Sequence, residues 1–377
     1  MRQATSIDDL REMARRRVPR AFFDYVDGGS YSEATLKANR ADLQALKFRQ
    51  RVMVDVSARS TACSILGRAA TMPVVLAPTG LTGLVHADGE ILAARAAAQV
   101  GVPFCLSTMS ICSLEQVRAA TDTPFWFQLY VMRDRGFVAS LLERARQADC
   151  PVLVLTADLQ VQGQRHRDIR NGLSVPPRLT FRSLLDFACR PRWAMGMLGT
   201  ANRSFGNLAA YLQSQDLATL SQWIAQQFDP SLSWRDLEWI RSLWPGKLVV
   251  KGILDPDDAR TAVACGADAV VVSNHGGRQL DHAPSSVSVL AAIAEAVRGK
   301  AEVFMDGGVR SGQDVAKALA CGADAAMIGR AFLYGLGAGG EDGVRTALEI
   351  IRRELDVTLA LAGCCSPAEL TPRHLHG

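Results

Sequence analysis

ADAVVVSNHGGRQLD (residues 267–281) begins as an apolar run and ends as a polar loop that contains His275, two glycines and Arg278. A short run that is apolar at every position is typical of a parallel strand covered by helices on both faces. The change to polar residues therefore places His275 and Arg278 just beyond the end of a buried strand. In barrels built from such strands, the active site forms at these carboxyl ends.

Seven further runs of this kind occur along the chain, beginning at Met72, Val102, Pro124, Pro151, Lys247, Glu302 and Ala325. Helical patterns such as DGEILAARAAAQVG and RSGQDVAKALACG lie between them and end in glycine, as helices often do. The motif ACGADA occurs twice, each time between a helical pattern and the next run. Eight alternations of strand and helix predict an α/β protein with a (β/α)8 TIM barrel.

The chain is expected to form one domain over residues 1–377. Residues 1–70 precede the first strand and look mostly helical, which predicts an N-terminal cap. Residues 71–335 form the barrel, and the long insertion 172–246 between its fourth and fifth strands is too long for a plain connection. Residues 336–377 form a C-terminal helix and tail.

Composition restricts the class of protein. The chain is 48% hydrophobic and 21% charged, as expected for a globular enzyme, and a net charge of +4 is too small to favour nucleic-acid binding. The first residues contain no signal-like apolar stretch, and no run of about 20 apolar residues is present. Nine cysteines include no C-x-x-C pair, so zinc has no support. We expect a cytoplasmic protein without a metal site.

Polar residues or glycine follow nearly every predicted strand. Any one of them could be a solvated strand end, but together they would face one pocket. In strand order they are Pro78 and Thr79, Ser107, Gln128 and Tyr130, Thr156 and Asp158, Lys251, Ser273 with His275 and Arg278, Asp306 and Arg310, and Gly329 with Arg330.

The last two strands end in glycine-rich turns with arginines, DGGVRSG and IGR. Glycine lets backbone N–H groups approach an anion, and the start of a following helix adds positive potential. Arginine matches phosphate oxygens two at a time. This pattern predicts a ligand that carries a phosphate, at the position where TIM barrels commonly bind one.

His275 is the candidate general base, because the ordinary pKa of histidine lies near neutrality. Asp158 could orient its ring and stabilise its charged form. Arg165 and Arg278 could clamp a small carboxylate, although ordinary surface charge is an equal alternative. Lys251 could form a Schiff base or place positive charge beside a cofactor ring. GLGAGG, from Gly335, follows the last strand and is interpreted as a loop rather than an NAD site.

SNHGGRQLD, LVVKGI, FQLYV, MDGGVRSGQDV and IGRAFLYGL resemble the FMN-dependent α-hydroxy-acid oxidases and dehydrogenases. The resemblance runs from VPRAFFDYVDGG to LALAGC, and within the family it points most to bacterial L-lactate and (S)-mandelate dehydrogenases. It implies FMN-dependent oxidation of an L-2-hydroxy acid to the 2-oxo acid, with quinone or oxygen taking the electrons. It also implies a homotetramer.

The resemblance also implies residue roles. His275 would take a proton as two electrons pass to flavin N5, and Asp158 would support the imidazolium. The substrate would be bound by Tyr25, Tyr130, Arg165 and Arg278. Lys251 would lie beside the flavin N1 and C2 carbonyl. The remaining cofactor contacts would come from Ala77, Pro78, Thr79, Ser107, Gln128, Thr156, Ser273, Asp306, Gly308, Arg310, Gly329 and Arg330.

Two features refine this expectation. Gly80 stands where compact oxidases tend to carry alanine, which leaves room for a bulkier substrate side chain. Residues 178–200 resemble a segment that docks on membranes in related dehydrogenases, with Phe187, Trp193 and two methionines near arginines. A loop packed on the barrel mouth or on another subunit is the equal alternative, so peripheral attachment to the inner face of the cell membrane is an open expectation.

Two other functions remain open from the residues alone. A barrel lyase or isomerase could use the phosphate site for its substrate and Lys251 for a Schiff base. A non-catalytic flavin-binding or scaffold protein is the other alternative. The set of His275, Arg278, Tyr130 and Lys251 argues against it, because a binding module has no need of a base.

Overall fold

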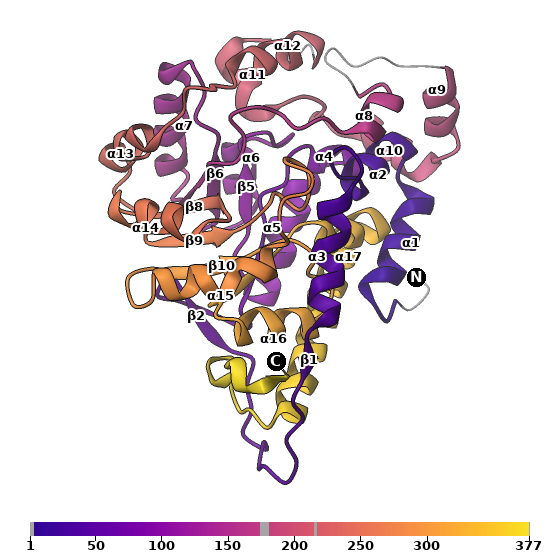
Figure 1. Cartoon of the computed structure of the whole chain (residues 1–377). Coiled ribbons are helices and arrows are strands. Elements are labelled where there is room, and N and C mark those ends of the chain that lie inside the picture. The colour runs from indigo at the N-terminus through magenta and orange to yellow at the C-terminus, as the bar shows by residue number, and fades with distance from the viewer. Residues whose placement is uncertain (1–3, 174–180, 215–216, 377) are drawn as a thin grey trace.

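The computed structural model describes residues 4–173, 181–214 and 217–376, and parallel strands surrounded by helices occupy its centre (Figure 1). The strands follow the order β4-β11-β10-β9-β8-β7-β6-β5, and a parallel bridge between Leu76 and Phe104 joins the two ends of this sheet into a barrel. The predicted (β/α)8 barrel is confirmed, because each apolar run forms one strand. The strands are β4 (Val74–Leu76), β5 (Cys105–Ser107), β6 (Trp126–Leu129), β7 (Val152–Thr156), β8 (Lys247–Ile253), β9 (Ala269–Val272), β10 (Glu302–Met305) and β11 (Ala325–Ile328).

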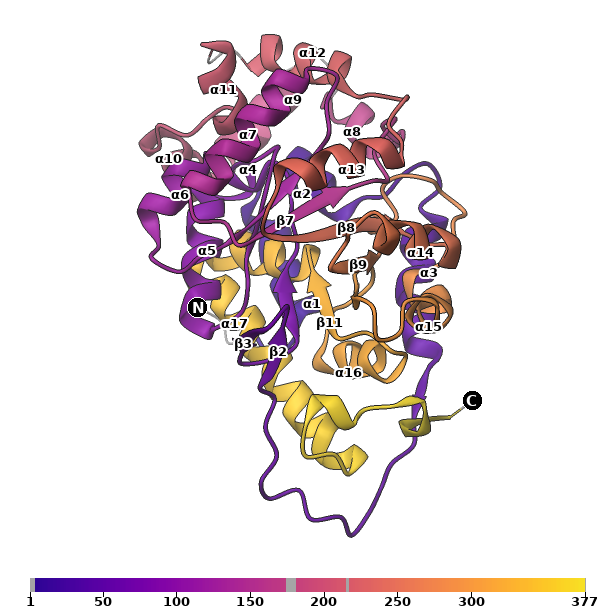
Figure 2. The same cartoon turned by 90° about the vertical axis from the view of Figure 1, so that its left-hand side faces the viewer.

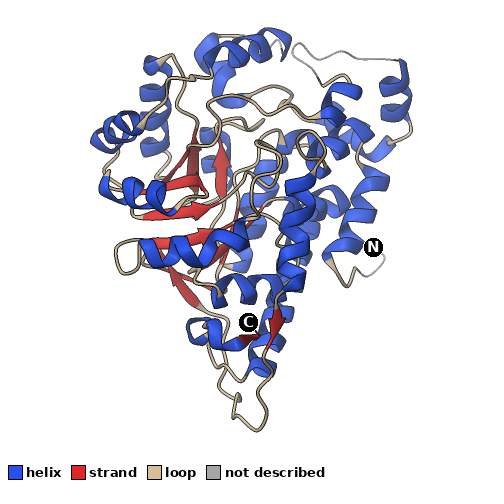
Figure 3. Ribbon diagram, in the orientation of Figure 1, coloured by secondary structure: helices blue, strands red, loops and turns tan. Residues whose placement is uncertain are grey.

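Helices between successive strands cover the outside of the barrel (Figure 3). Most begin at a side chain that accepts a hydrogen bond from the first turn, as Ser113, Ser285 and Ser311 do. The helices of the barrel layer are α4 (Thr82–Val85), α5 (Gly89–Val100), α6 (Leu114–Ala120), α7 (Arg135–Gln147), α14 (Pro256–Ala264), α15 (Ser286–Ala296), α16 (Gly312–Ala320) and α17 (Arg330–Ala362).

The twin ACGADA motifs make equivalent turns into β9 and β11. In each motif the glycine, Gly266 or Gly322, has a positive φ. The aspartate that follows accepts a hydrogen bond from the backbone of the neighbouring strand: Asp268 from Leu248 at 2.9 Å and Asp324 from Val303 at 2.7 Å. The repeat in the sequence thus reflects a repeated way of starting a strand.

The GLGAGG stretch does not form the loop that the sequence suggested. It lies inside α17, which is kinked where Gly339 and Gly340 leave helical geometry. Gly340 has φ +62, which a residue without a Cβ adopts at little cost. Glycines therefore allow this helix to bend rather than end.

A hairpin closes the amino end of the barrel. It consists of β2 (Cys63–Ile65) and β3 (Arg68–Ala70), and its Ile65 packs in the cluster that fills the barrel interior. The backbone N–H of Leu66 donates to both carboxylate oxygens of Glu302, each at 3.0 Å. Because Glu302 is the first residue of β10, the hairpin lies at the end opposite the predicted site.

The first 70 residues are only partly helical. Helices α1 (Ile7–Arg17), α2 (Arg20–Asp27) and α3 (Ala34–Ala45) are followed by β1 (Lys47–Phe48), which pairs antiparallel with β12 (Leu375–His376). The chain then runs extended along the C-terminal tail, which includes η1 (Pro367–Glu369) and η2 (Pro372–His374), as the long loop at the lower end of Figure 2 shows. The expectation of a mostly helical segment is wrong beyond Ala45, since residues 46–70 bond to other parts of the chain.

The insertion after β7 forms helices that lie at the upper end of the molecule in Figure 1. The described helices are α8 (His166–Arg170), α9 (Phe181–Ala188), α10 (Pro191–Gly199), α11 (Gly206–Leu212), α12 (Leu217–Gln227) and α13 (Trp234–Leu243). Residues 174–180 and 215–216 of the predicted insertion lie outside the described residues.

Candidate active site

His275 and Asp158 form a hydrogen-bonded pair beyond the ends of β9 and β7, the two strands on either side of β8. Asp158 lies two residues beyond β7, and His275 lies three residues beyond β9. His275 Nδ1 is 2.9 Å from Asp158 Oδ1, while its Nε2 has no hydrogen bond to any described residue. A carboxylate on one ring nitrogen orients the imidazole and leaves the other nitrogen free for proton transfer.

The charge of Asp158 suits this arrangement. Burial opposes its ionisation, but attraction to His275, their hydrogen bond and the charge of Lys251 together hold the pKa of the carboxyl below its usual range. Asp158 is therefore ionised at neutral pH. A fixed negative charge at Nδ1 stabilises the imidazolium that forms when His275 takes a proton.

Lys251 is buried at the carboxyl end of β8. Its Nζ lies 2.8 Å from Asp306 Oδ2 and donates to Ser273 Oγ at 2.8 Å. Burial lowers the pKa of Lys251, but the charges of Asp306 and Asp158 outweigh burial and leave that pKa raised. The next residue must be glycine, since at φ +107 a Cβ on Gly252 would lie 2.7 Å from Asp158. The site thus holds a permanent buried cation.

The ring of Tyr25 lies against two guanidinium groups. Arg278 Cζ is 4.6 Å and Arg165 Cζ is 5.2 Å from the ring centroid. Arg278 also donates to the backbone oxygens of Tyr25 and Gly28. Burial, followed by repulsion from Arg165, lowers the pKa of Arg278, but an arginine remains charged at neutral pH. Helix α2 of the cap therefore brings Tyr25 against two arginines, and this cationic group of side chains suits a carboxylate.

Gly80 and Tyr130 lie beside Tyr25 and its arginines. A Cβ placed on Gly80 would lie 3.8 Å from the hydroxyl of Tyr25 and 3.1 Å from Met109 Cβ. Tyr130 packs edge-on against Phe228, with ring centroids 6.3 Å apart. Burial raises the pKa of Tyr130, so its hydroxyl stays protonated and can donate a hydrogen bond.

The strand ends from β4 to β7 supply a buried polar wall. Ser107 Oγ donates to Gln128 Oε1 at 2.9 Å, and the N–H of Thr108 reaches the same oxygen at 3.3 Å. Thr156 is buried beside them. Thr79 lies at the mouth of the barrel, and its hydroxyl oxygen is 2.8 Å from the hydroxyl oxygen of Thr82. Ala77 and Pro78 connect β4 to Thr79. The N–H of Ala77 donates to the backbone oxygen of Ile328 at 2.9 Å, and Pro78 is half-buried.

The ends of β10 and β11 bring Asp306, Gly308, Arg310, Gly329 and Arg330 together. Gly308 has φ +88, and a Cβ there would lie 2.2 Å from the backbone oxygen of Asn39, so the turn packs directly on the cap. Arg310 Cζ lies 5.6 Å from the ring centroid of Tyr334. Gly329 precedes the first turn of α17, where backbone N–H groups are available to an anion.

The side chain of Arg330, which the sequence assigns to the phosphate, also makes three hydrogen bonds within the protein. Its guanidinium donates to the backbone oxygens of Val26 at 2.8 Å, Gly28 at 2.7 Å and Gly276 at 2.9 Å. Burial lowers its pKa to about 9, so it remains a cation at neutral pH. Arg330 therefore ties the cap to the loop that carries His275.

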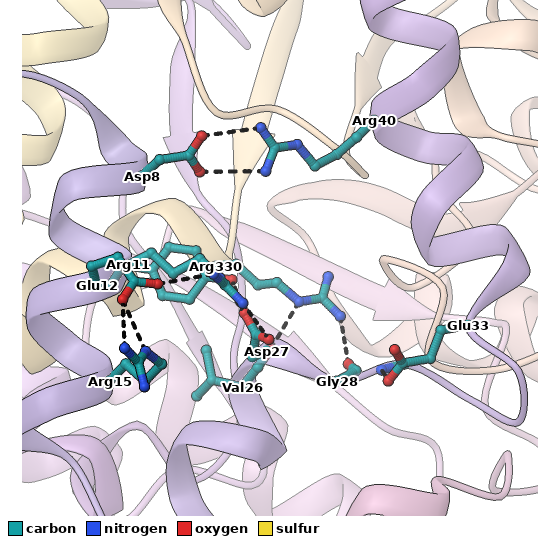
Figure 4. Close-up of polar contacts among 12 residues, drawn as sticks. Asp8, Arg11, Glu12, Arg15, Val26, Asp27, Gly28, Glu33, Arg40 and Arg330 are labelled. Carbon is teal, nitrogen blue, oxygen red and sulfur yellow. Dashed lines mark hydrogen bonds and ion pairs between the residues drawn. The ribbon is translucent and has the colours of Figure 1, made fainter. Parts of the chain in front are cut away.

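A charged network around Asp27, part of which is drawn in Figure 4, was not predicted from the sequence. Asp27, at the end of α2, accepts two hydrogen bonds from Arg11, at 2.6 and 2.9 Å. It also accepts from Tyr334 at 2.8 Å and from Arg167 at 3.1 Å. The network joins α1, α2, α8 and α17, and its members lie so far apart in the chain that no local pattern could reveal them.

Glu90 is a second residue that the sequence did not reveal. It is almost fully buried, and its Oε1 accepts from the N–H groups of Gly83 at 3.0 Å and Ile111 at 2.9 Å. Burial raises the pKa of this carboxyl. Glu90 thereby joins the loop after β4, which carries Gly80, to the loop after β5.

Three buried polar atoms in the site lack a hydrogen-bond partner among the described residues: Gln128 Nε2, Asp158 Oδ2 and Asp306 Oδ1. Leaving such groups unsatisfied costs about 1–3 kcal/mol each, so they indicate a polar ligand between β6 and β10. A flavin ring and its ribityl hydroxyls would supply acceptors and donors at these positions, and the turns at Gly308 and Gly329 suit a phosphate. The residues present therefore fit FMN.

The fold is a TIM barrel that carries, at one end, a histidine–aspartate pair, two arginines around Tyr25 and glycine-rich turns that suit a phosphate. A family model for FMN-dependent dehydrogenases matches residues 14–377. The chain belongs to this family of FMN-dependent oxidoreductases.

Known proteins are similar over nearly the whole chain. L-lactate dehydrogenase of Caulobacter vibrioides strain NA1000 / CB15N is 51% identical over 362 residues, which cover 95% of this chain and 94% of that one. A crystal structure of the monotopic membrane protein (S)-mandelate dehydrogenase has a TM-score of 0.95 and 39% identity, with all of both chains covered. The crystal structure of mandelate oxidase with (S)-2-phenylpropionate has a TM-score of 0.84 and 37% identity, and the match covers 99% of this chain and 98% of that one.

Proposed function

We propose that the protein oxidises an L-2-hydroxy acid to the corresponding 2-oxo acid, with His275 as the base. The observation that carries this proposal is the His275–Asp158 pair, with a free Nε2, beside the cationic pocket of Tyr25 and Arg278. When bound, FMN supplies the two-electron acceptor at its N5. A base next to a carboxylate pocket is what removal of a proton from a hydroxy acid requires.

The substrate carboxylate would be bound by Arg278 and the hydroxyl of Tyr25, with Arg165 near the same tyrosine ring. Arginine binds carboxylates with a planar pair of donors, which also orients the acid. Tyr130, held in its protonated form, would donate to the substrate hydroxyl or to the developing carbonyl oxygen. His275 Nε2 then takes the proton, and Asp158 stabilises the charge.

Lys251 supports oxidation rather than Schiff-base chemistry. A nucleophilic lysine must be deprotonated, whereas Lys251 is paired with Asp306 and has a raised pKa. A permanent cation instead stabilises negative charge on a reduced cofactor ring. This argues against the alternative of a barrel lyase or isomerase.

The substrate is proposed to be lactate, mandelate or a similar acid, because the similar proteins act on acids of these two kinds by name. Gly80 favours tolerance of an aromatic or longer side chain, since no Cβ occupies the space towards Tyr25. Quinone and oxygen are the candidate electron acceptors.

The proposal is tested by replacing His275 with glutamine, which keeps a polar side chain and removes the base. We expect the rate of FMN reduction by the L-acid to fall by about 10²–10⁴-fold. FMN binding should be retained, because the turns that suit the phosphate are unchanged. Stopped-flow absorbance without oxygen measures the rate, and a variant that reduces FMN as fast as wild type would exclude His275 as the base.

We also propose peripheral membrane association through α9 and α10, whose helices expose Leu185, Met195 and Leu198. A cavity of about 270 Å³ beside them is lined by basic side chains that include Arg16 and Arg192. Apolar side chains next to basic ones suit a surface of anionic lipid. The similar (S)-mandelate dehydrogenase is a monotopic membrane protein.

The aromatic part of the predicted docking segment packs differently from the expectation. Phe187 and Trp193 stack with Phe22 of α2, at centroid distances of 5.8 and 5.4 Å, and Trp193 Nε1 donates to Leu84 at 2.9 Å. These rings hold the insertion on the cap. Residues 178–180 lie outside the described residues, and no described helix is long and apolar enough to cross a membrane.

A further inference from the structure

Asn39 and Asn274 form a reciprocal amide pair between the cap and the loop that carries His275. Asn39 Nδ2 donates to Asn274 Oδ1 at 2.8 Å, and Asn274 Nδ2 donates to Asn39 Oδ1 at 2.8 Å. Both side chains are buried, with 1% and 4% of their surface exposed. A buried amide pair with both bonds made is directional and resists rotation of either side chain.

The pair is connected directly to the backbone on both sides of His275. Asn274 Oδ1 also accepts from the N–H of Gly277 at 3.0 Å, and Asn274 Nδ2 donates to Pro284 at 3.0 Å. Asn274 therefore closes the turn that contains His275. The orientation of its amide is fixed by Asn39 together with Gly277 and Pro284, because only the observed orientation satisfies all three.

The turn needs such support. His275 has φ +57, a left-handed conformation that residues with a Cβ rarely adopt, and Gly276 and Gly277 follow at +65 and +72. A histidine in this conformation persists when its surroundings hold it there. The same Asn39 also packs against the turn at Gly307 and Gly308, so it contacts both loops.

We propose that Asn39 is a positioning residue that holds His275, through Asn274, at the angle needed to take the substrate proton. This inference rests on the proposed function of His275 as the base. Asn39 touches neither substrate nor the reacting atoms. Its effect should therefore appear in the step in which the proton is transferred, and hardly in substrate binding.

Asn39→Asp tests the proposal with the exchange of one NH₂ group for oxygen. The new oxygen would face Asn274 Oδ1 at the present donor distance of 2.8 Å. At a pH where the new carboxyl is ionised, Asn274 relieves that repulsion by turning its amide, which directs its NH₂ at the N–H of Gly277. Both the repulsion between the two oxygens and the turning of the Asn274 amide would loosen the turn around His275.

The matched control is Thr35→Val, one turn earlier on α3. It removes the hydrogen bond from Thr35 Oγ1 to the backbone oxygen of Ala283, at 3.0 Å, in the same loop but away from His275. Both residues are almost fully buried. The two variants therefore perturb the same helix and loop by similar changes, and only Asn39→Asp acts on Asn274.

We expect Asn39→Asp to slow FMN reduction by about 10- to 100-fold, with KM within about twofold of wild type, since small displacements of a catalytic group have such effects. The kinetic isotope effect on FMN reduction, measured with α-deuterated substrate, should be larger in Asn39→Asp than in wild type. Thr35→Val should leave both the rate of FMN reduction and KM within about twofold of the wild-type values. In the apoprotein, amide hydrogen exchange should rise around residues 274–277 only in Asn39→Asp, which is a readout independent of activity.

If Asn39→Asp and Thr35→Val reduce FMN at equal rates, the inference is overturned, even if amide hydrogen exchange rises in Asn39→Asp. If Asn39→Asp fails to fold, Asn39→Ser removes the pair without adding charge and is expected to give the same order of rates. His275→Gln separates the two claims. A fast His275→Gln enzyme defeats the proposed function, whereas a slow one with a fast Asn39→Asp enzyme defeats only the role of Asn39.

Discussion

At the scale of single residues, the site is assembled from side chains that their own neighbours hold in unusual states. His275 has a left-handed backbone, Lys251 is a buried cation with Asp306 beside it, and Asp158 is a partly buried anion. Each state would be unfavourable alone, because burying a charge or forcing a positive φ costs free energy. Together they satisfy one another, so the loss of one partner should disturb the others.

Gly80→Ala is a test at this scale. The added methyl would lie 3.8 Å from the Tyr25 hydroxyl, beside the proposed substrate pocket. We expect kcat/KM for L-mandelate to fall about tenfold or more relative to that for L-lactate, because one carbon in a tight pocket has effects of this size. Steady-state kinetics with both acids measure the ratio.

Gly199→Ala is the matched control, since a Cβ at Gly199 meets nothing within 4 Å. It should leave the preference between the two acids unchanged. If Gly80→Ala also leaves the preference unchanged, Gly80 does not select the substrate side chain.

At the scale of elements, the cap is held on the barrel by ion pairs as well as apolar packing. Asp27 accepts hydrogen bonds from α1, α8 and α17 at once, and Arg330 bonds to the backbone at the end of α2. Tyr25 lies on that same helix. The position of a proposed substrate contact therefore depends on the charges of residues outside the site.

Asp27→Asn tests that dependence through pH. Burial raises the pKa of Asp27, but its bonds to Arg11 and Tyr334 and the nearby charges lower it from 3.8 to about 2. Because the folded pKa is the lower one, the stabilisation is present above about pH 4 and is lost as pH falls towards 2. It amounts to about 2 kcal/mol, at about 1.4 kcal/mol per pH unit.

We expect wild type to be more stable than Asp27→Asn at neutral pH and the difference to shrink below pH 4, as measured by thermal unfolding at several pH values. Asp8→Asn is the control, because the Asp8–Arg40 pair in Figure 4 is exposed and such pairs contribute little. A difference that stays constant down to pH 2 would show that the charge of Asp27 does not matter.

The barrel strands could be predicted from the sequence because each is apolar on both faces, which is a local signal. The polar residues after them could be predicted because parallel strands end at one rim. The hairpin at Ile65 could not, since its strands are three residues long and carry no period. The kink at Gly340, the Asp27 network and the Asn39–Asn274 pair depend on partners that are distant in the chain.

At the scale of the whole molecule, the two ends of the barrel have different tasks. The hairpin and the C-terminal tail close the amino end, while the cap and the insertion surround the end that carries His275. Exposed apolar side chains occur at both ends, with Met195 and Leu198 on α10 and Val357 near the end of α17. Those on α10 adjoin a cavity lined by several arginines, which include Arg16 and Arg192.

Sedimentation with vesicles of anionic lipid tests membrane association. We expect wild type to sediment with them and the double variant Met195→Glu/Leu198→Glu to do so much less, since it places negative charge at the lipid surface. Val357→Glu, at the opposite end, is the control and should behave as wild type. Wild-type protein that stays entirely in the supernatant would contradict docking through α10.

The most direct test of the account is the visible spectrum of the purified protein, recorded without oxygen while L-lactate or L-mandelate is added. The account predicts a flavin spectrum that bleaches with an L-acid and not with its D form. Readmitted oxygen would then restore the colour quickly in an oxidase and slowly in a dehydrogenase. A protein whose bound FMN keeps its oxidised spectrum with both acids would contradict the proposed oxidation.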